Sequence, residues 1–258
     1  YIIFSMLLCS DIHFSIQSKE MLNTLRQYSL LNDIIIITGD FVQRGFQNQF
    51  QQAHDFLISL IEHATVIITP GNHDLGDIFG EWIPGRHAAH QRYSTYLHKP
   101  FVQQPTVVAH RDFDAVLRID DHVYVSLNST HKGSLIPWNP PGRIEAHQIT
   151  WARDVLADQR AQNHHFLTHR SMWKHPRDLH RPLSANEPLE QFLKDFQFQS
   201  FIHGHNHRYI AQESPTPLLK FPILEISLPT LSRRHRRSEQ RCGFVIWKPP
   251  AEPKPVFF

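Results

Sequence analysis

The chain is short of glycine and cysteine, and each shortage narrows the class of protein. Its 258 residues include only 10 glycines, about 4% of the chain, against a usual share of ~7%. The two cysteines, Cys9 and Cys242, are too few to form a disulfide framework. Proteins without such a framework belong more often to a reducing compartment, so we expect a cytoplasmic location.

Net charge and long apolar runs are scarce as well. With 26 Lys and Arg against 24 Asp and Glu, the formal net charge is +2, which argues against a protein that coats nucleic acid through a strongly basic face. No apolar stretch approaches the ~18 residues that span a membrane, and the longest, residues 1–9, is interrupted by Ser5. Hydrophobic residues at 41% and charged residues at 19% predict a folded globular chain.

Strand and helix patterns alternate along the first half of the chain. Continuous apolar runs at residues 2–9, 34–37 and 66–68 predict buried strands, and helical spacing of apolar residues predicts helices over 15–31 and 49–63. Such βαβ units imply mostly parallel strands covered by helices. The second half is richer in short strands. We expect them at 115–119, 122–127, 164–168, 198–203, 209–212, 223–228 and 244–247, with a helix at 145–156.

No change in composition marks a domain boundary, so we expect one domain over residues 1–258. Glycines and prolines loosen the pattern from residue 76 to residue 111. We interpret this segment as an insertion or lid over one end of the sheet, with a helix at about 87–97.

Histidine is the residue in excess, with 20 copies, and five of them stand in polar motifs that follow predicted strands. In open α/β sheets the carboxyl ends of the strands share one edge, where ligands bind. We therefore expect five segments to converge on one site. They are Asp11 and His13; Gly39 and Asp40; Gly71 to Asp74; His169; and Gly204 to His207.

These residue types match a metal site. Asp and His supply oxygen and nitrogen ligands suited to Mn, Fe, Zn or Ni, and the scarcity of cysteine argues against a thiolate site. A shared carboxylate can bridge two cations, and pairs of metal ions ~3.5–4 Å apart are a common device for hydrolysing phosphate esters. Three of the ten glycines directly precede Asp40, Asn72 and His205. Because glycine permits left-handed turns and close packing, we expect a crowded site.

Together the motifs resemble those of the calcineurin-like metallophosphoesterase superfamily. All five motif blocks of that family are present in order across residues 11–207. They are Asp11-x-His13, Gly39-Asp40, Gly71-Asn72-His73-Asp74, His169 and Gly204-His205-x-His207. The resemblance implies an α/β fold, namely a four-layer α/β/β/α sandwich of two mixed β-sheets flanked by helices.

A weaker similarity points to one branch of the family, the bacterial class III cyclic-nucleotide phosphodiesterases. It rests on three short segments: Leu127-Asn128-Ser129, Gly142-Arg143-Ile144 and Gln148-x-x-Trp151. A cyclic-nucleotide-like substrate is therefore the first candidate.

The resemblance also implies a role for each motif residue. One metal ion would be held by Asp11, His13 and His207, and the other by Asn72, His169 and His205, with Asp40 bridging them. His73 would be the catalytic histidine, oriented by Asp74. Mn and Fe, divalent or trivalent, are the metals most expected, with Zn, Ni and Co as alternatives. A hydroxide bridging the metals would attack phosphorus, and His73 would assist departure of the alcohol.

Two positions depart from common patterns of the superfamily. Gln43 stands where the protein phosphatases have Asp, which argues against that branch. Arg170 follows His169 where close relatives often have a His-x-Pro sequence. Since arginine can contact phosphate through two parallel hydrogen bonds, Arg44 and Arg170 are candidate substrate-binding residues, and an exposed Arg170 is the alternative.

We therefore expect a metal-dependent phosphoric ester hydrolase that acts on a small phosphodiester. Diesters have poor alcohol leaving groups, which benefit from a proton donor such as His73. The alternatives within the family are a hydrolase of nucleotide-sugar lipid pyrophosphates and a nuclease. A scaffold on the same fold is the non-enzymatic alternative, but such relatives tend to lose ligands and all seven ligand positions are present here. No protein partner is implied, and the oligomeric state stays open.

Some features have no place in this interpretation. Fifteen histidines lie outside the motifs. One of those in the insertion, such as His87, His90 or His98, could contact the substrate and contribute to its recognition. The basic run at residues 233–237 could meet an anionic lipid or nucleic acid, but a solvated loop is the simpler interpretation.

Overall fold

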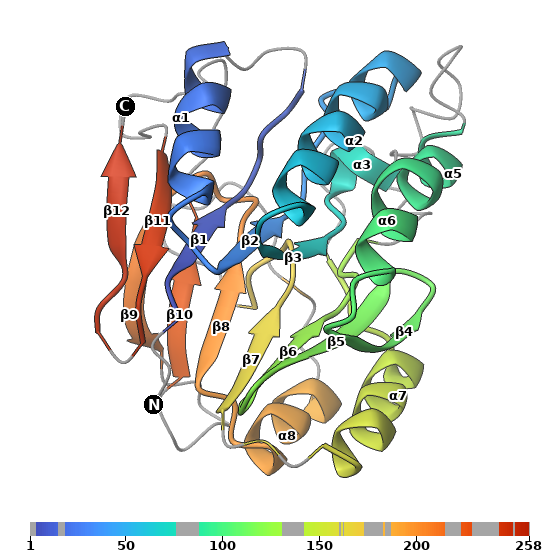
Figure 1. The fold of residues 1–258 in the computed structure, drawn as a ribbon. Helices are drawn as coiled ribbons and strands as arrows, with labels where there is room; N and C mark the ends of the chain where they lie inside the picture. Colours follow the sequence, from blue (N-terminus) through green and yellow to red (C-terminus); the bar gives the residue numbers. More distant parts are fainter. Residues whose placement is uncertain are drawn as a thin grey trace.

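Two β-sheets form the centre of the fold (Figure 1). The computed structural model describes residues 4–14, 19–75, 88–130, 142–159, 161, 163–172, 183, 187–214, 223–228, 243–249 and 251–257. The strand order is β12-β11-β1-β2-β3 in the first sheet and β4-β5-β6-β7-β8-β10-β9 in the second. Each sheet contains both parallel and antiparallel neighbours, so the expectation of two mixed sheets is confirmed.

The first sheet is built from the apolar runs of the N-terminal half. Its parallel strands are β1 (Met6–Cys9), β2 (Ile34–Thr38) and β3 (Thr65–Thr69), and β11 (Gly243–Trp247) and β12 (Lys254–Phe257) complete it. Every residue of β1 and β2 is buried, because both faces of the sheet are covered, and such strands have continuous apolar sequences. Helices α1 (Lys19–Ser29) and α2 (Gln47–Ile61) cover the outer face (Figure 1).

The second sheet carries most of the β-rich half of the chain. Its strands are β4 (Val107–Arg111), β5 (Asp114–Ile119), β6 (His122–Ser126), β7 (Asn163–Leu167), β8 (Ser200–His203), β9 (Ile210–Ser214) and β10 (Ile223–Ser227). A turn at Asp120 and Asp121 joins β5 and β6, which pair antiparallel.

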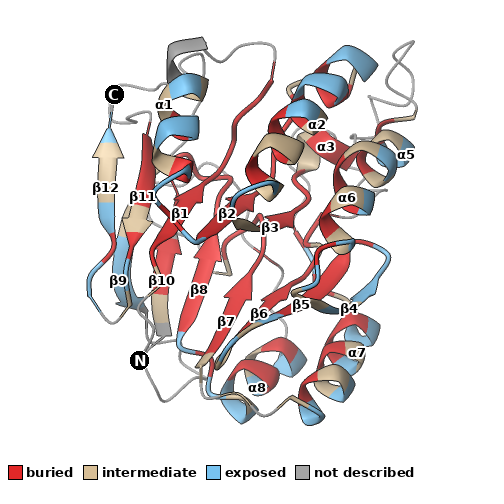
Figure 2. Cartoon of the chain, viewed as in Figure 1, coloured by how far each residue is buried: buried red, intermediate tan, exposed pale blue. Residues whose placement is uncertain are grey.

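Side chains of the second sheet alternate between two cores. Along β5, Ala115 and Leu117 pack toward the first sheet, whereas Val116 packs toward helices α7 (Ala146–Ala157) and α8 (Glu187–Asp195). Neighbours on β8 divide in the same way, Ile202 to one core and Phe201 to the other. Period-two alternation is what a sheet covered on both faces requires. The layers are therefore helix, sheet, sheet and helix, with buried strands between partly exposed helices (Figure 2), as expected.

The described part of the predicted insertion is a helical run. It consists of α5 (Ala89–Tyr93), a π-helical turn η1 (Ser94–His98) and α6 (Lys99–Val102). Tyr96 stacks on Phe50 of α2, and the Gln104 amide bonds both the N–H (2.9 Å) and the carbonyl (2.8 Å) of Val66 at the edge of β3. These residues therefore belong to the helical layer. The rest of the predicted lid, residues 76–87, lies outside the described residues.

Several elements of the described chain have no counterpart in the sequence predictions, among them β4, α8 and β12. Strand β12 lies in what reads as a proline-rich tail, and an edge strand is where a sheet accommodates proline. None of the helices in the described part of the chain is long and apolar enough to cross a bilayer.

Candidate metal centre

The motif segments converge at the carboxyl ends of the central strands. The loops after β1 and β2 run side by side, because Asp11 N–H donates to the Gly39 carbonyl (3.0 Å) and His13 N–H donates to the Asp40 carbonyl (2.9 Å). The loops after β7 and β8 are joined in the same way, by a bond from Gly204 N–H to the His169 carbonyl (3.1 Å). Main-chain bonds therefore fix the position of these loops relative to each other.

Five predicted ligands have left-handed backbone conformations. Their φ angles are 54° for Asp11, 52° for His13, 54° for Asp40, 64° for His205 and 56° for His207. Such angles cost about 1–2 kcal/mol each in a residue other than glycine. Strain of this kind collects at functional sites, where the surrounding structure holds it in place.

Left-handed residues are rarer elsewhere in the described chain. Only three other non-glycine residues with positive φ are found there, namely Asp112, Asp120 and Gln197. Asp112 and Asp120 lie in the β4–β5 and β5–β6 turns, where such angles are ordinary. The strain at the metal centre is thus not a general property of the fold.

Asp and His side chains from these loops form overlapping groups. In each group the candidate ligand atoms all lie within 4.8 Å of one another. Among the described residues the groups are Asp11, His13 and His207; Asp40, His169 and His205; and His13, Asp40 and His73. The third group joins the other two, and Asn72 is also adjacent, since its Oδ1 lies 3.2 Å from His169 Nε2. All seven residues that the sequence assigns to metal binding therefore lie together.

Hydrogen bonds hold both carboxylates in place. Asp11 Oδ2 accepts from the Ser10 hydroxyl (2.5 Å) and from His205 N–H (3.1 Å), while its Oδ1 lies 3.0 Å from His207 Nε2. Asp40 Oδ1 accepts from the backbone N–H of His73 (2.9 Å). One oxygen of each carboxylate is thus anchored while the other faces the imidazoles.

The ring of His169 shows why the cluster suits a cation. Its Nδ1 donates to the carbonyl of Thr38 (2.7 Å), so in the neutral ring the lone pair is on Nε2. That atom faces Asp40 Oδ2 at 3.4 Å and Asn72 Oδ1 at 3.2 Å. Three electron-pair donors that face one another are stabilised by a positive ion between them, and this mixture of N and O ligands fits Mn, Fe or Zn.

The pKa values of the carboxylates reflect the same arrangement. Burial by itself raises the pKa of Asp11, but His207 and His169 together outweigh this effect and lower the pKa to about 2. Burial likewise opposes ionisation of Asp40, yet His169 holds its pKa well below the usual range. Both side chains are therefore carboxylates at neutral pH, which is the form that binds metal.

The pKa values of two of the imidazoles, those of His169 and His13, shift in opposite directions. Burial lowers the pKa of His169, but Asp40, together with Asp11 and the carbonyl of Thr38, outweighs burial and raises the pKa to about 9. Burial and the nearby His73 lower the pKa of His13 to about 3. The cluster thus favours positive charge beside Asp40 and keeps His13 neutral, as a ligand must be.

Glycine makes this packing possible, as the sequence predicts. Gly39 has a φ of +86°, and a Cβ there would lie 2.6 Å from His169 Nδ1. A Cβ at Gly71 would overlap the Asp40 carboxylate, and one at Gly204 would overlap the Ser10 hydroxyl. The three glycines before Asp40, Asn72 and His205 therefore stand where a side chain would displace part of the site.

His73 lies at the rim of the centre. Its side chain is 29% exposed and its Nε2 is 4.0 Å from Asp40 Oδ2. Nδ1 donates to the carbonyl of Gln43 (2.7 Å), and the ring meets His13 edge to face, with the centroids 4.9 Å apart. The bond to Gln43 fixes the ring so that Nε2 faces the carboxylate.

Asp74, which the sequence assigns to orienting His73, makes two bonds to the main chain. Its carboxylate accepts from the N–H groups of Val42 (3.0 Å) and Gly71 (2.9 Å). Burial and the charge of Asp40 raise its pKa to about 8. Asp74 therefore ties the loop after β2 to the loop after β3.

The two candidate substrate-binding arginines lie in different surroundings. Arg44 is exposed, and its backbone N–H donates to Gln49 Oε1 (2.9 Å). Arg170 is only 2% exposed, which rules out the exposed alternative, and burial lowers its pKa to about 10. A Cβ at Gly142 would overlap the Arg170 side chain, so this arginine packs inside the protein.

Three residues to which the sequence analysis gave no part in the site also shape it. Ser10 anchors Asp11 through its hydroxyl, whereas Thr38 and Gln43 act through main-chain carbonyls. A pattern of side chains cannot reveal a main-chain acceptor, although the position of Ser10 beside Asp11 was a usable signal.

Other features singled out in the sequence lie elsewhere. His98 is buried and packs edge to face against Phe113, with the centroids 5.3 Å apart, so it is a core residue. His90 is exposed on α5. His87 and the basic run at 233–237 lie outside the described residues.

Comparison with known proteins identifies the family. A profile for calcineurin-like phosphoesterases matches residues 4–209. None of the curated proteins matches the chain.

Solved structures share the fold at low sequence identity. The purple acid phosphatase PPD1 from yellow lupin (Lupinus luteus) seeds has a TM-score of 0.64 at 14% identity, covering 95% of this chain and 49% of the lupin chain. TT1561 of Thermus thermophilus has a TM-score of 0.56 at 11% identity and covers 99% of both chains. GAP50, described as the anchor in the inner membrane complex of Plasmodium, has a TM-score of 0.57 at 11% identity and covers 99% of this chain and 84% of that one.

The chain thus spans about half the length of the lupin protein. The profile match, however, extends over every residue of the candidate metal centre, from Asp11 to His207. The chain belongs to the calcineurin-like phosphoesterase family.

Proposed function

We propose that the protein hydrolyses small phosphodiesters at a dinuclear metal centre. The observation that carries this proposal is the position of Asp40, whose carboxylate belongs both to the group with His169 and His205 and to the group with His13 and His73. One carboxylate that faces both halves of the cluster is suited to bridging two ions. The proposed ligands are Asp11, His13, Asp40, Asn72, His169, His205 and His207.

The metal ions, for which Mn and Fe are our first candidates, would when bound act as Lewis acids that polarise the phosphoryl oxygens and activate water. The contribution of the chain is to hold the ligands in place beforehand. Asp11 is anchored by Ser10 and by the main chain of His205, and His169 is anchored by Thr38. Ligands that do not need to reorganise make this electrostatic stabilisation effective.

His73 is the proposed proton donor to the leaving alcohol. Its Nδ1 hydrogen is engaged by Gln43, so in the protonated ring the Nε2 hydrogen would face the centre, at the partly exposed rim where substrate enters. General acid catalysis of this kind contributes about 10²–10⁴-fold to the rate. It matters most for an alkoxide leaving group, which supports a diester as the substrate class.

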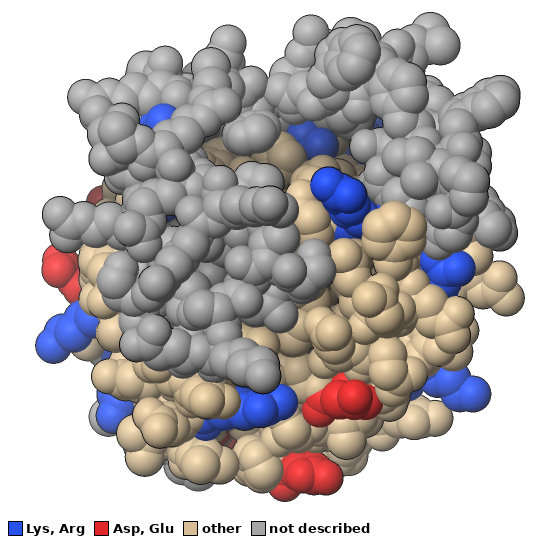
Figure 3. Space-filling view, turned by 90° about the horizontal axis from the view of Figure 1, so that it is seen from above, with Lys and Arg blue, Asp and Glu red and all other residues tan. Residues whose placement is uncertain are grey.

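The overall balance of charge supports a small substrate. Figure 3 views the molecule from above, and the described Lys and Arg side chains that are seen there lie in separate patches. A protein that binds nucleic acid needs a continuous basic surface to neutralise several phosphates. The formal net charge of +2 for the whole chain does not point to such a surface, which favours a small diester such as a cyclic nucleotide over a polymer.

A parallel assay tests this proposal. The Mn-loaded protein is offered a cyclic mononucleotide, a chromogenic diester, a chromogenic monoester and a UDP-linked lipid. We expect kcat/KM to be highest for one of the two diesters, and chelation of the metal to abolish turnover. A preference for the monoester or the lipid would overturn the substrate class. Absence of turnover with all four substrates while metal is bound would overturn the enzymatic proposal.

A further inference from the structure

A cavity of about 480 Å³ lies apart from the metal ligands. Its walls come from α5 and η1, the turn between β4 and β5, the end of β6 and the first turn of α7. Residues that line it include His90, Ser94, Asp112, Asp114, Asn128 and His147. Small-molecule sites have volumes of about 300–1,000 Å³, so this cavity could accept a compact organic group.

One wall of the cavity adjoins the strand that carries His169. Strands β6 and β7 pair parallel, and the main-chain bond from Leu127 N–H to the Leu167 carbonyl (3.1 Å) continues the pairing. Asn128 and His169 therefore follow neighbouring strands at the same edge of the sheet. Ser129, the next residue, accepts from the backbone N–H of Arg170 (3.2 Å).

The opposite wall adjoins the segment that carries His73. Helix α3 (Asn72–Leu75) packs on α5. A Cβ at Gly45 would lie 3.0 Å from the Ala89 Cβ and 3.8 Å from the His73 carbonyl oxygen. Gly45 thus lies close to both Ala89 and the main chain of His73, and the residue after Ala89, His90, lines the cavity. The cavity lies between two elements that each reach the metal centre.

The floor of the cavity is a rigid polar network. Asp114 is 4% exposed, and its Oδ1 accepts from Asn128 N–H (2.8 Å) and from the Gln148 amide (2.8 Å). The same amide donates to the Asn128 carbonyl (3.0 Å), and its oxygen accepts from Glu145 N–H (2.7 Å). Gln148 thereby joins α7, β5 and β6, so the floor is formed before any ligand binds.

The chemistry of the lining selects one kind of ligand. Two carboxyl groups, Asp112 and Asp114, and two imidazoles, His90 and His147, offer hydrogen-bond acceptors. Among the described residues that line the cavity there is no Lys or Arg. A second phosphate would find no Lys or Arg to pair with there, whereas hydroxyl and amino groups would find acceptors.

We propose that this cavity is the subsite for the alcohol portion of the phosphodiester, an uncharged group that carries hydroxyl or amino donors. The inference rests on the proposed function, since it needs the phosphate to be bound at the neighbouring metal centre. A nucleoside and a polyol such as glycerol share this chemistry, and the experiment distinguishes them.

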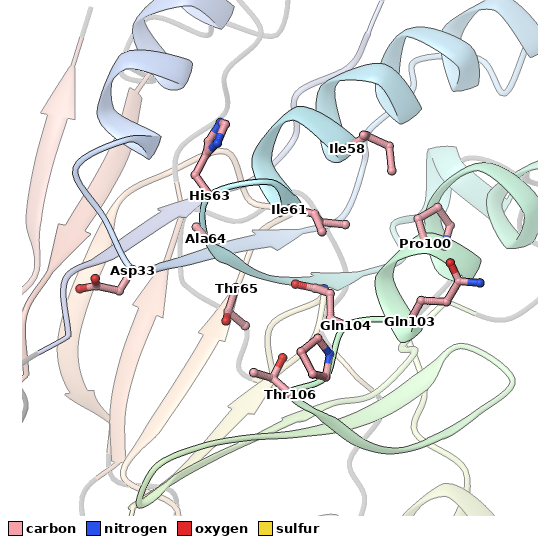
Figure 4. A pocket seen from close by; sticks show the side chains of 11 residues that line it. Asp33, Ile58, Ile61, His63, Ala64, Thr65, Pro100, Gln103, Gln104 and Thr106 are labelled. Carbon is pink, nitrogen blue, oxygen red and sulfur yellow. The ribbon is translucent and has the colours of Figure 1, made fainter.

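The test compares substrates with and without such donors. One is a cyclic mononucleotide, one is a glycerophosphodiester, and the reference is bis(4-nitrophenyl) phosphate, which carries neither hydroxyl nor amino groups. The variants are His90→Ala and Asp112→Asn, both at exposed positions, and asparagine tolerates the left-handed angle of Asp112. The control is His63→Ala in a separate cavity of about 580 Å³ at the amino ends of β2 and β3 (Figure 4).

For each protein, kcat/KM for the preferred donor-bearing substrate is divided by kcat/KM for the reference substrate. We expect this ratio to fall about five- to twenty-fold in both cavity variants, because each loses one hydrogen bond to the substrate. In His63→Ala the ratio should stay within about twofold. The substrate that shows the fall distinguishes a nucleoside from a polyol. Ratios unchanged in both cavity variants, or lowered equally in the control, would overturn the subsite.

A binding measurement separates this proposal from the catalytic one. Adenosine and glycerol are titrated separately into the metal-free protein and followed by NMR chemical shifts. We expect one of them to perturb the cavity residues, with a weaker effect in Asp112→Asn. If the protein turns over no substrate but this binding is present, the proposed function fails, and the cavity remains a binding site for a group that carries hydroxyl or amino donors. If neither compound perturbs the cavity, the subsite is wrong whatever the activity.

Discussion

His169 Nε2 lies 3.4 Å from Asp40 Oδ2, and this contact joins the two β-sheets. Asp40 follows β2 in the first sheet, and His169 follows β7 in the second. The same imidazole reaches back through Nδ1 to the carbonyl of Thr38, the last residue of β2. The metal centre is thus complete only when the sheets pack on each other, so we expect metal binding to stabilise the fold.

Gly39→Ala should disrupt the contacts that His169 makes with Asp40 and Thr38 between the two sheets. The new Cβ would lie 2.6 Å from His169 Nδ1, at a backbone φ of +86°. The left-handed angle and the clash together should lower the free energy of unfolding by about 2 kcal/mol or more. We also expect weaker metal binding, because His169 must move. Urea unfolding and elemental analysis measure the two effects.

Gly45→Ala is the matched control for Gly39→Ala. Gly45 also has a positive φ, +71°, but a Cβ there would meet Ala89 at 3.0 Å and no proposed ligand. It should lose stability and keep its metal. Equal metal loss in both variants would show that backbone strain alone accounts for the effect.

His73→Ala should slow diester hydrolysis by about 10²–10⁴-fold while metal content stays the same. The imidazole is held by Gln43 at the rim of the centre, where it can donate a proton without being needed as a ligand. Steady-state kinetics with a chromogenic diester and metal analysis of the same sample measure both quantities. Loss of metal together with activity would make His73 a ligand instead, and unchanged turnover would remove it from catalysis.

His165 should make the fold less stable as the pH falls. It is 1% exposed and hydrogen-bonds to Ser200 Oγ and His122 Nδ1, both at 2.8 Å. Burial and the neighbouring His122 lower its pKa from 6.5 to about 3. Between these values the unfolded chain binds a proton at this residue that the folded chain does not, so stability decreases from pH 6.5 toward pH 3.

The expected loss attributable to His165 is about 1.4 kcal/mol between pH 8 and pH 5.5. Comparison with His165→Gln isolates it, because other titrating groups contribute to both proteins. Urea unfolding at the two pH values should show the variant gaining that amount relative to the parent. A difference that does not change with pH would mean that His165 is protonated equally in the folded and unfolded chains.

Much of the fold could be predicted because strongly apolar runs such as residues 34–37 have one physical use, a strand buried on both faces. The convergence of the candidate metal ligands could be predicted because these residues directly follow such strands. Strand β12 could not, since Pro255 argues against a strand except at an edge. Burial of Arg170 was also unforeseen, because arginine is rarely buried in general, and its position depends on space left by Gly142.

The orientation of the side chains at the site could not be predicted from the sequence, for a different reason. His73 is fixed by the carbonyl of Gln43 and His169 by that of Thr38, and every residue offers a carbonyl. The packing of the two sheets decides how the loops cross, and thereby which carbonyl accepts the hydrogen bond from each imidazole. For the same reason the sequence paired Asp74 with its neighbour His73, whereas the structure gives it the main chain of Val42 and Gly71.

The most direct test of the account is a count of metal ions in the native chain and in Asp40→Asn. After reconstitution with Mn and removal of free metal, the native chain should hold about two ions, and Asp40→Asn, which lacks the shared carboxylate, at most about one. Asp55→Asn, at an exposed position on α2, should hold as many ions as the native chain. About one ion or fewer in the native chain, or a full pair in Asp40→Asn, would contradict a dinuclear centre bridged by Asp40.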